Sequence, residues 1–161
     1  MVYANRQYYL GDFDNDFVPD GNGRETYPDN SNYEGEYKYG LKNGYGIFNW
    51  PDGSKYIGTF KHNYMHGKGS YFNKGKSYVG DWANNRMDGE GSLISEDGSK
   101  YIGQFKNGKR HGYGEYYWQD GRTYKGRWTN GLKEGEGAYT HPKGIKKMGT
   151  WKEGSLILEI E

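Results

Sequence analysis

The sequence predicts an all-β protein: an elongated, curved, single-layer antiparallel sheet built from tandem β-hairpin repeats of about 23 residues. Three observations lead to this prediction: an internal repeat, alternation of large and small residues within it, and an unusual composition. Glycine accounts for 28 of the 161 residues and aromatic residues for 18%. Aliphatic residues are scarce, which argues against a layered aliphatic core. The aromatic content argues against disorder, because disordered chains are poor in aromatic residues.

The repeat begins with the pattern Tyr-x-Gly-x-aromatic, which recurs at steps of 22 or 23 residues. In each repeat a Gly-x-Gly pair begins eleven residues after the tyrosine, and a further glycine marks a later turn. Self-similarity at a fixed period is typical of proteins in which each repeat packs only against its neighbours. The clear repeats start at Tyr33, Tyr56, Tyr78, Tyr101 and Tyr124.

Two weaker repeats flank these five. Tyr9 begins a repeat of 24 residues with one insertion, and Asn30 replaces its far-turn glycine. Asparagine tolerates positive φ better than most residues. The segment Lys147–Trp151 matches the pattern except for the tyrosine. We therefore expect a lead-in over residues 1–8 and seven repeats over residues 9–161, starting at 9, 33, 56, 78, 101, 124 and 147.

Each repeat is expected to form two short antiparallel strands. In the repeat that begins at Tyr101, residues 101–105 alternate in the manner of a strand, and residues 106–109 include turn formers. Residues 112–118 alternate again, and Asp-Gly at 120–121 is a strong hairpin signal. No window shows the 3.6-residue period of a helix.

Glycine and aromatic side chains fall on one face of each predicted strand, because strand side chains alternate between faces. We expect both glycines of each Gly-x-Gly pair to leave gaps that rings on the neighbouring strand fill. Asn63 and Asn85 replace the second glycine of the first turn in two repeats, and both are expected to be left-handed. A single layer cannot bury both of its faces. Apolar residues expected on the opposite face, exposed or in contact with a partner, are Ile47, Phe72, Ile94 and Tyr117.

The sequence contains no pattern typical of catalysis. It has no cysteine, and its four histidines are spaced too far apart or lack a nearby carboxylate, so we expect no metal site. The segment Gly75-Lys76-Ser77 resembles the end of a phosphate-binding loop, but the first glycine of that motif is missing. We therefore expect no catalytic residue, no cofactor and no enzymatic activity.

Charge and hydropathy exclude further classes. The net charge is +1, so no overall field favours nucleic acid, and no run of about 20 apolar residues could cross a bilayer. The N-terminal residues lack the apolar segment of a signal peptide. We expect a cytoplasmic protein.

The pattern Tyr-x-Gly-x-(Phe/Trp)-x-x-Gly-x-x-x-Gly-x-Gly, with a later Asp-Gly, closely resembles the MORN repeat (membrane occupation and recognition nexus). The resemblance covers nearly the whole chain. It departs from the pattern in the first repeat, which has an insertion, and in the last, which stops after fifteen residues. The resemblance implies a curved single-layer sheet and a scaffold or adaptor role. Residues 109–114 are similar to repeats of radial spoke head components.

The resemblance thus implies a non-enzymatic, cytoskeleton-associated scaffold that mediates protein–protein interaction, with the ciliary axoneme or radial spoke as the expected assembly. Its partners would be other proteins of a large assembly, among them a second MORN protein or a second copy of this chain. Alternatively, the aromatic residues serve only as the core of the sheet. The candidate contact residues on the second strands are Phe48, Trp50, Tyr71, Tyr116, Trp118 and Tyr139.

The C-terminal segment is a further candidate contact. In the sequence register, Leu158 and Ile160 stand where other repeats have Gly-x-Gly, and Leu156 lies just before them. These aliphatic side chains either close the last gap in the sheet or meet a partner, for which strand addition would be the natural mode.

Charge is unevenly distributed along the chain. Residues 1–32 carry two basic and six acidic residues, and residues 101–146 carry nine basic and four acidic residues. This distribution reflects either an ordinary solvated surface or a polarity that orients docking. Lys125 and Arg127 share one face of their strand. The alternative function is therefore a peripheral membrane module that binds anionic phospholipids through these two residues and neighbouring turn lysines.

Overall fold

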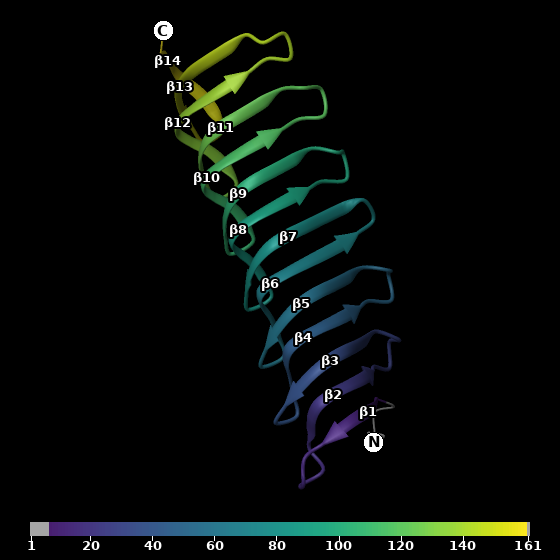
Figure 1. Cartoon of the computed structure of the whole chain (residues 1–161). Coiled ribbons are helices and arrows are strands. Elements are labelled where there is room, and N and C mark those ends of the chain that lie inside the picture. Colours follow the sequence, from purple (N-terminus) through teal and green to yellow (C-terminus); the bar gives the residue numbers. More distant parts are fainter. Residues whose placement is uncertain (1–6, 161) are drawn as a thin grey trace. The chain divides into compact units, whose positions relative to one another are not determined.

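The computed structural model describes residues 7–160, which form fourteen β-strands and no helix (Figure 1). The strand order follows the order of the chain. The chain divides into two compact units, which we describe separately. Unit 1 comprises the residues up to Lys74 together with Trp82–Asn85, and unit 2 comprises Gly75–Asp81 and the residues from Arg86 onward.

The strands form tandem hairpins, and within each unit neighbouring strands pair antiparallel in one layer. The predicted all-β fold of tandem hairpins is therefore confirmed. Unit 1 contains β1 (Tyr8–Phe13), β2 (Pro19–Thr26), β3 (Asn32–Lys38), β4 (Leu41–Asn49), β5 (Lys55–Lys61) and β6 (Tyr64–Asn73). β7 (Lys76–Ala83) is divided between the units. Unit 2 contains β8 (Arg86–Ile94), β9 (Lys100–Lys106), β10 (Lys109–Tyr117), β11 (Thr123–Thr129), β12 (Leu132–Thr140), β13 (Lys146–Lys152) and β14 (Ser155–Ile160).

From the β3–β4 hairpin onward, the turns inside the hairpins have two residues with positive φ, the geometry that matches the twist of paired strands. Asn63 has φ 72° and Asn85 has φ 66°, which confirms that both are left-handed. The amide N–H of Asn63 donates to the carbonyl oxygen of Lys42 in the preceding repeat at 3.0 Å, and its side-chain oxygen accepts from the Lys42 amide at 2.9 Å. These turns therefore also tie one repeat to the next.

The turns between hairpins are closed by local hydrogen bonds. The amide of Trp50 donates to the carbonyl oxygen of Ser54 at 2.9 Å, and the amide and hydroxyl of Ser54 both donate to Asp52. The equivalent glycine, Gly53, has φ 85°. Asn30, predicted to take this position in the first repeat, has φ 69°. The Asp-Gly signal in the sequence thus corresponds to a real turn with a defined hydrogen-bond pattern.

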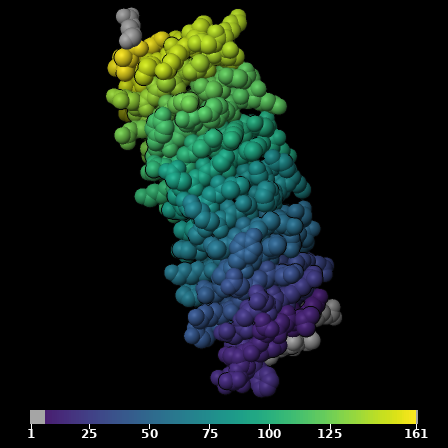
Figure 2. All heavy atoms as spheres, in the orientation of Figure 1, coloured from purple at the N-terminus to yellow at the C-terminus, as the bar shows by residue number. Residues whose placement is uncertain are grey.

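The core consists of aromatic rings that interlock between adjacent repeats. The tyrosine that begins each of six repeats is almost fully buried, as is the aromatic residue four positions later in most of them. Tyr101 packs edge-on against Phe105 of its own strand at 5.1 Å and against Trp128 of the next repeat at 5.4 Å. Figure 2 shows the atoms of successive repeats within a unit as adjacent bands of colour. Edge-to-face pairs of this kind stabilise a core by about 0.5–1.5 kcal/mol beyond their burial.

The two glycines of each Gly-x-Gly pair have different roles, so the expectation that both leave gaps for rings is only half right. A Cβ atom on the second glycine of the β10 pair, Gly114, would lie 2.2 Å from the hydroxyl oxygen of Tyr101. The first glycine, Gly112, has φ 62° instead and lies where the β9–β10 register shifts. The second glycine makes room for a ring, whereas the first allows a bulge.

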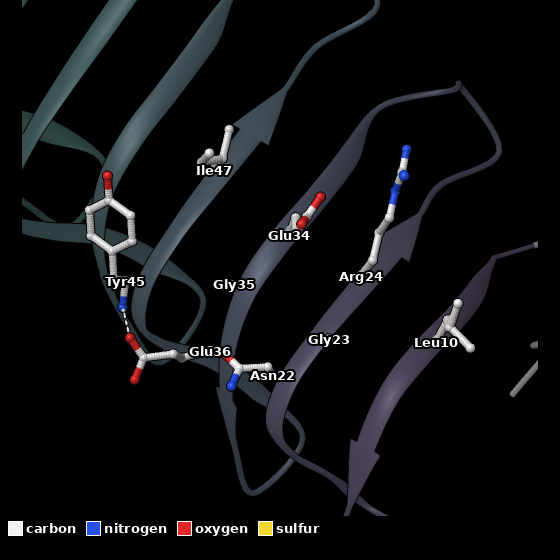
Figure 3. Close-up of a pocket in the computed structure, with 9 residues that line it drawn as sticks. All are labelled: Leu10, Asn22, Gly23, Arg24, Glu34, Gly35, Glu36, Tyr45 and Ile47. Carbon is white, nitrogen blue, oxygen red and sulfur yellow. Dashed lines mark hydrogen bonds between the residues drawn. The ribbon is translucent and has the colours of Figure 1, made fainter.

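The bulge explains why six of the seven repeats begin with tyrosine rather than phenylalanine. Between Gly35 and Tyr37 the β3–β4 ladder skips Glu36. The hydroxyl of Tyr33 donates to the Glu36 carbonyl oxygen at 3.0 Å. The Glu36 side chain accepts from the amide of Tyr45 at 2.7 Å, on the opposite side of the bulge (Figure 3). Backbone groups that lose their ladder partners at the bulge are thereby satisfied.

Candidate protein-binding faces

The sheet of each unit has two chemically distinct faces. We call the face that holds the buried tyrosines the aromatic face, and the other the open face. In unit 1, Tyr33 pairs with Phe48, and Phe48 pairs with Tyr56, which places the second-strand aromatic residues on the aromatic face. In unit 2, Tyr116 pairs with both Tyr101 and Tyr124 and lies on the same face as they do.

In unit 1 the predicted contact residues form a row of half-buried rings. Phe48 lies 4.6 Å from Trp50, and Trp50 lies 5.8 Å from Tyr71. Tyr27, which the repeat pattern does not single out, stacks on Phe48 at 5.8 Å. Because the strands of the unit lie in one layer, the exposed parts of these rings are available on the aromatic face.

Unit 2 carries an equivalent row on its own aromatic face. Tyr116 lies 4.6 Å from Trp118, and Trp118 lies 6.1 Å from Tyr139. The ring of Trp128 lies 6.0 Å from Tyr116 and joins this row to the core. The six second-strand candidates thus divide into two clusters of three, and the structure brings each cluster together.

Lys42 and Glu25 form an ion pair among the rings of unit 1, which the repeat pattern does not predict. The Lys42 ammonium lies 3.1 Å from the Glu25 carboxylate and 5.2 Å from the centre of the Tyr27 ring. Tyr27 and Tyr37 donate hydrogen bonds to the same carboxylate. Burial acts to raise the pKa of Glu25, but the Tyr27 hydrogen bond and the charge of Lys42 outweigh it and hold the pKa below its usual value. The pair leaves this part of the face locally neutral.

The Glu25 pKa predicts a specific loss of stability in acid. Because the pKa is lowered in the folded state, the carboxylate stabilises the fold above its unfolded pKa, and that contribution disappears as pH falls through the folded pKa. Glu25→Gln should lower the free energy of unfolding at pH 7 by about 1–3 kcal/mol and flatten its fall below pH 4.5. Urea unfolding at pH 7 and pH 3 measures both effects. Glu34→Gln, at an exposed position on the open face, is the matched control; an equal loss in both variants would contradict the prediction.

Three cations lie among the rings of unit 2: Arg110, Arg122 and Lys133. The Arg110 guanidinium lies 4.6 Å from the centre of the Trp128 ring, and that of Arg122 lies 5.2 Å from the centre of the Trp118 ring. The Lys133 ammonium lies 5.7 Å from the Trp118 ring centre. Burial, followed by the charges of Arg122 and Arg110, lowers the pKa of Lys133. We call Arg110, Arg122, Lys133, Tyr116, Trp118 and Tyr139 the cationic aromatic surface.

The sequence carries a signal for these cations. The second residue of the second strand faces the rings, and that position changes character from repeat to repeat. It is Lys42, Met65, Met87, Arg110 and Lys133 in successive repeats. The alternation of strand faces would have placed all five beside the aromatic residues.

The open face of unit 1 carries both apolar and charged side chains. A pocket there is lined by Leu10, Arg24, Glu34 and Ile47 on neighbouring strands, with glycines between them (Figure 3). Phe72 on β6 is also exposed on this face. Arg24 and Glu34 lie side by side between Leu10 and Ile47, so this row is not a continuous apolar patch.

The candidate lipid-binding residues Lys125 and Arg127 both lie on the open face of unit 2, as predicted. The Lys125 ammonium forms an ion pair with Glu115 at 2.8 Å, and Tyr117 donates to the same carboxylate. Arg127 is exposed. Because the charge of Lys125 is offset by Glu115, this pair of cations offers less attraction to anionic lipid than the sequence suggested.

In the C-terminal hairpin, the observed strand register differs from the one that the sequence predicts. Leu158 pairs with Thr150 and Ile160 pairs with Met148, so neither residue takes a glycine position. The bulge in this hairpin differs from the others, and both side chains reach the open face, where they are 60% and 49% exposed. Leu156 pairs with Trp151 instead, and one of its methyl groups occupies the space beside Gly149. Leu156 alone therefore closes the gap on the aromatic face.

The described part of the chain, residues 7–160, holds no group of three or more His, Cys, Asp or Glu side chains placed to bind a metal ion. It also holds no helix long and apolar enough to span a membrane.

Tandem antiparallel hairpins, buried tyrosines over glycines and rows of half-buried aromatic rings define a β-hairpin repeat protein with the features of an interaction scaffold. A family model of the MORN repeat matches residues 9–32, 33–55, 56–77, 78–100, 101–121 and 124–146. The chain therefore belongs to the MORN-repeat family. The hairpin β13–β14 lies after the last matched range. No curated protein sequence matches the chain.

Two solved structures are similar to the chain to different degrees. The TCP domain of Drosophila melanogaster SAS-4 (dCPAP), in complex with a proline-rich motif of Ana2 (dSTIL), is similar with 15% identity and a TM-score of 0.53, over 93% of this chain and 81% of that chain. The wild-type TCP10 domain of Danio rerio CPAP has 14% identity and a TM-score of 0.35, over 100% of this chain and 98% of that chain. The first likeness supports the sheet architecture alone.

Proposed function

We propose that this MORN-repeat protein is a non-enzymatic scaffold that binds partner proteins through its aromatic faces within a cytoskeletal assembly. The observation that carries the proposal is the row of half-buried rings in each unit, Phe48–Trp50–Tyr71 and Tyr116–Trp118–Tyr139. These rings exceed what the core requires, because the buried tyrosines already fill the spaces over the glycines.

Half-exposed aromatic rings on a rigid sheet suit recognition of an extended segment. Tyrosine and tryptophan are enriched among the residues that dominate binding energy at interfaces. A rigid face loses little conformational entropy on binding. The proline-rich motif held by the SAS-4 domain suggests the kind of segment that a related sheet accepts, since proline-rich chains dock on aromatic side chains.

For the cellular setting we propose the cytoplasm, with the ciliary axoneme and its radial spokes as the assembly. The support for this placement is the family resemblance of the repeats, of which residues 109–114 are an example.

Proximity labelling in ciliated cells tests this proposal. The wild-type chain should label axonemal or other cytoskeletal proteins, and the double variant Trp50→Ala plus Trp118→Ala should lose about 10-fold or more of that labelling, because tryptophan truncation at an interface commonly costs more than 1 kcal/mol. Tyr113→Ala removes an aromatic ring that is 56% exposed on the open face and is the control.

Two results would contradict different parts of the proposal. Absence of cytoskeletal proteins from the wild-type catch would overturn the placement. Full retention of the catch by the double tryptophan variant would overturn the role of the aromatic faces.

A further inference from the structure

The cationic aromatic surface of unit 2 carries more positive charge than its described carboxylates offset. Arg122 forms an ion pair with Asp120 at 2.7 Å. The Arg110 side chain donates instead to the carbonyl oxygen of Gly131 at 3.0 Å and stacks over rings. In unit 1 the corresponding lysine, Lys42, is paired with Glu25. The surface in unit 2 thus suits a ligand that brings both carboxylates and an apolar group.

A segment with these properties lies in the same chain. The loop between β1 and β2 belongs to unit 1 and lies within residues 12–20, which contain four aspartates and no lysine or arginine. Phe17 in this loop is 75% exposed and has φ 60°, an uncommon value for a residue with a large side chain. We call residues 12–20 the acidic loop.

The acidic loop is ordered by its own hydrogen bonds. The Asp14 side chain accepts from the amides of Asp16 and Val18, both at 2.9 Å. The Asp14 amide donates to the carbonyl oxygen of Val18 at 2.9 Å. These bonds hold Phe17 outward on a defined turn, so little conformational entropy is lost when the loop binds.

We propose that the acidic loop of one copy docks on the cationic aromatic surface of unit 2 of a second copy, so that the protein associates with itself. The inference rests on the proposed function in one respect, since both use the aromatic face as a binding surface. Phe17 would pack against Trp118 and Tyr139, and the aspartates would face Arg110 and Lys133.

The two surfaces are unlike, and this sets the form of the assembly. A copy that offers its loop to one neighbour still has its cationic aromatic surface available to another, so the contact is heterologous and continues into chains or rings. A single loop buries little area, which predicts weak, concentration-dependent association. Opposite charges predict strong salt dependence.

Sedimentation velocity on the full chain tests the proposal. The mass should rise above the 18.5 kDa monomer as concentration increases. It should return to the monomer value when ionic strength is raised from about 0.1 M to about 1 M, which shortens the screening length from about 10 Å to about 3 Å.

Two variants identify the surfaces. A loop variant carries Asp16→Asn and Phe17→Ala, and a surface variant carries Arg110→Gln and Lys133→Gln. Each alone should remain monomeric. A mixture should form one-to-one dimers but no longer species, because the loop variant keeps an intact surface and the surface variant keeps an intact loop. Arg127→Gln plus Lys146→Gln removes the same charge from the open face and should associate like wild type. Tryptophan fluorescence confirms that each variant is folded, and Trp118→Ala replaces the surface variant if that one is unfolded.

A monomer at every concentration, unchanged association of the loop variant, or equal loss in the open-face variant would each overturn the proposal. The loop variant leaves both aromatic rows intact, so it should still capture cytoskeletal partners in the labelling experiment. A failure of the self-association test would therefore leave the scaffold function standing, and a failure of the scaffold test would leave self-association standing.

Discussion

Gly114→Ala is expected to destabilise the protein by about 3 kcal/mol, the upper end of the range for overpacking a core. The backbone of Gly114 does not require positive φ, so the cost is steric. The added methyl group would lie 2.2–2.5 Å from three atoms of the Tyr101 side chain. That ring cannot move aside easily, because it is buried between Phe105 and Trp128 and its hydroxyl donates to the Gln104 carbonyl oxygen at 2.9 Å.

Gly108→Ala is the matched control for this prediction. Gly108 has φ 80° and no atom within 4 Å of the added methyl group, so its substitution costs only backbone strain of about 1–2 kcal/mol. Urea unfolding followed by tryptophan fluorescence measures the difference. A cost at Gly114 no larger than at Gly108 would show that the ring does not confine this position.

Tyr101→Ala is expected to cost about 3–5 kcal/mol, as removal of large buried aromatic residues does. The loss has two sources: the space left over Gly114 and the edge-to-face contacts with Phe105 and Trp128. Because Trp128 belongs to the next repeat, the substitution also weakens the interface between repeats on which a repeat protein depends.

One further substitution, together with a control, separates the contribution of the Tyr101 ring to stability from that of its hydroxyl. Tyr101→Phe should cost only about 1 kcal/mol, because it keeps the ring and loses the hydrogen bond to Gln104. Tyr113→Ala, on the open face, should cost about 0.5 kcal/mol or less. In the Tyr101→Ala background, Gly114→Ala should lose most of its cost, since the clashing ring is gone. Equal costs for Tyr101→Phe and Tyr101→Ala would contradict the role of the ring.

The lipid-binding alternative loses support from the side-chain geometry. The sequence places Lys125 and Arg127 on one face, which is correct, but it does not show that Lys125 is paired with Glu115 across the strand pair β10–β11. Arg110 and Lys133 on the aromatic face lie among aromatic rings, which suits an acidic protein segment that also carries an apolar group more than a lipid surface.

The repeat pattern predicted the strands, both kinds of turn and the left-handed asparagines because each depends on local chemistry. A two-residue turn needs residues that tolerate positive φ, and alternation sets the face of each side chain wherever the ladder is regular. That reasoning also identified the six second-strand aromatic residues that form the half-buried rows. It failed at the bulges, where the number of skipped residues decides which face the following side chain reaches.

Leu158 and Ile160 show this limit most clearly. Counting residues from earlier repeats placed them at glycine positions, but the last hairpin has a different bulge, and one residue of register moves a side chain to the other face. The different roles of Gly112 and Gly114 also arise from a bulge, the one at which the β9–β10 register shifts. The amino-acid order by itself therefore determined the tandem hairpins, the buried tyrosines and the aromatic rows. Only the packed sheet decided which glycine receives a ring, which cations lie over the rings and which residue closes the last repeat, because register and ion pairing depend on how the strands meet.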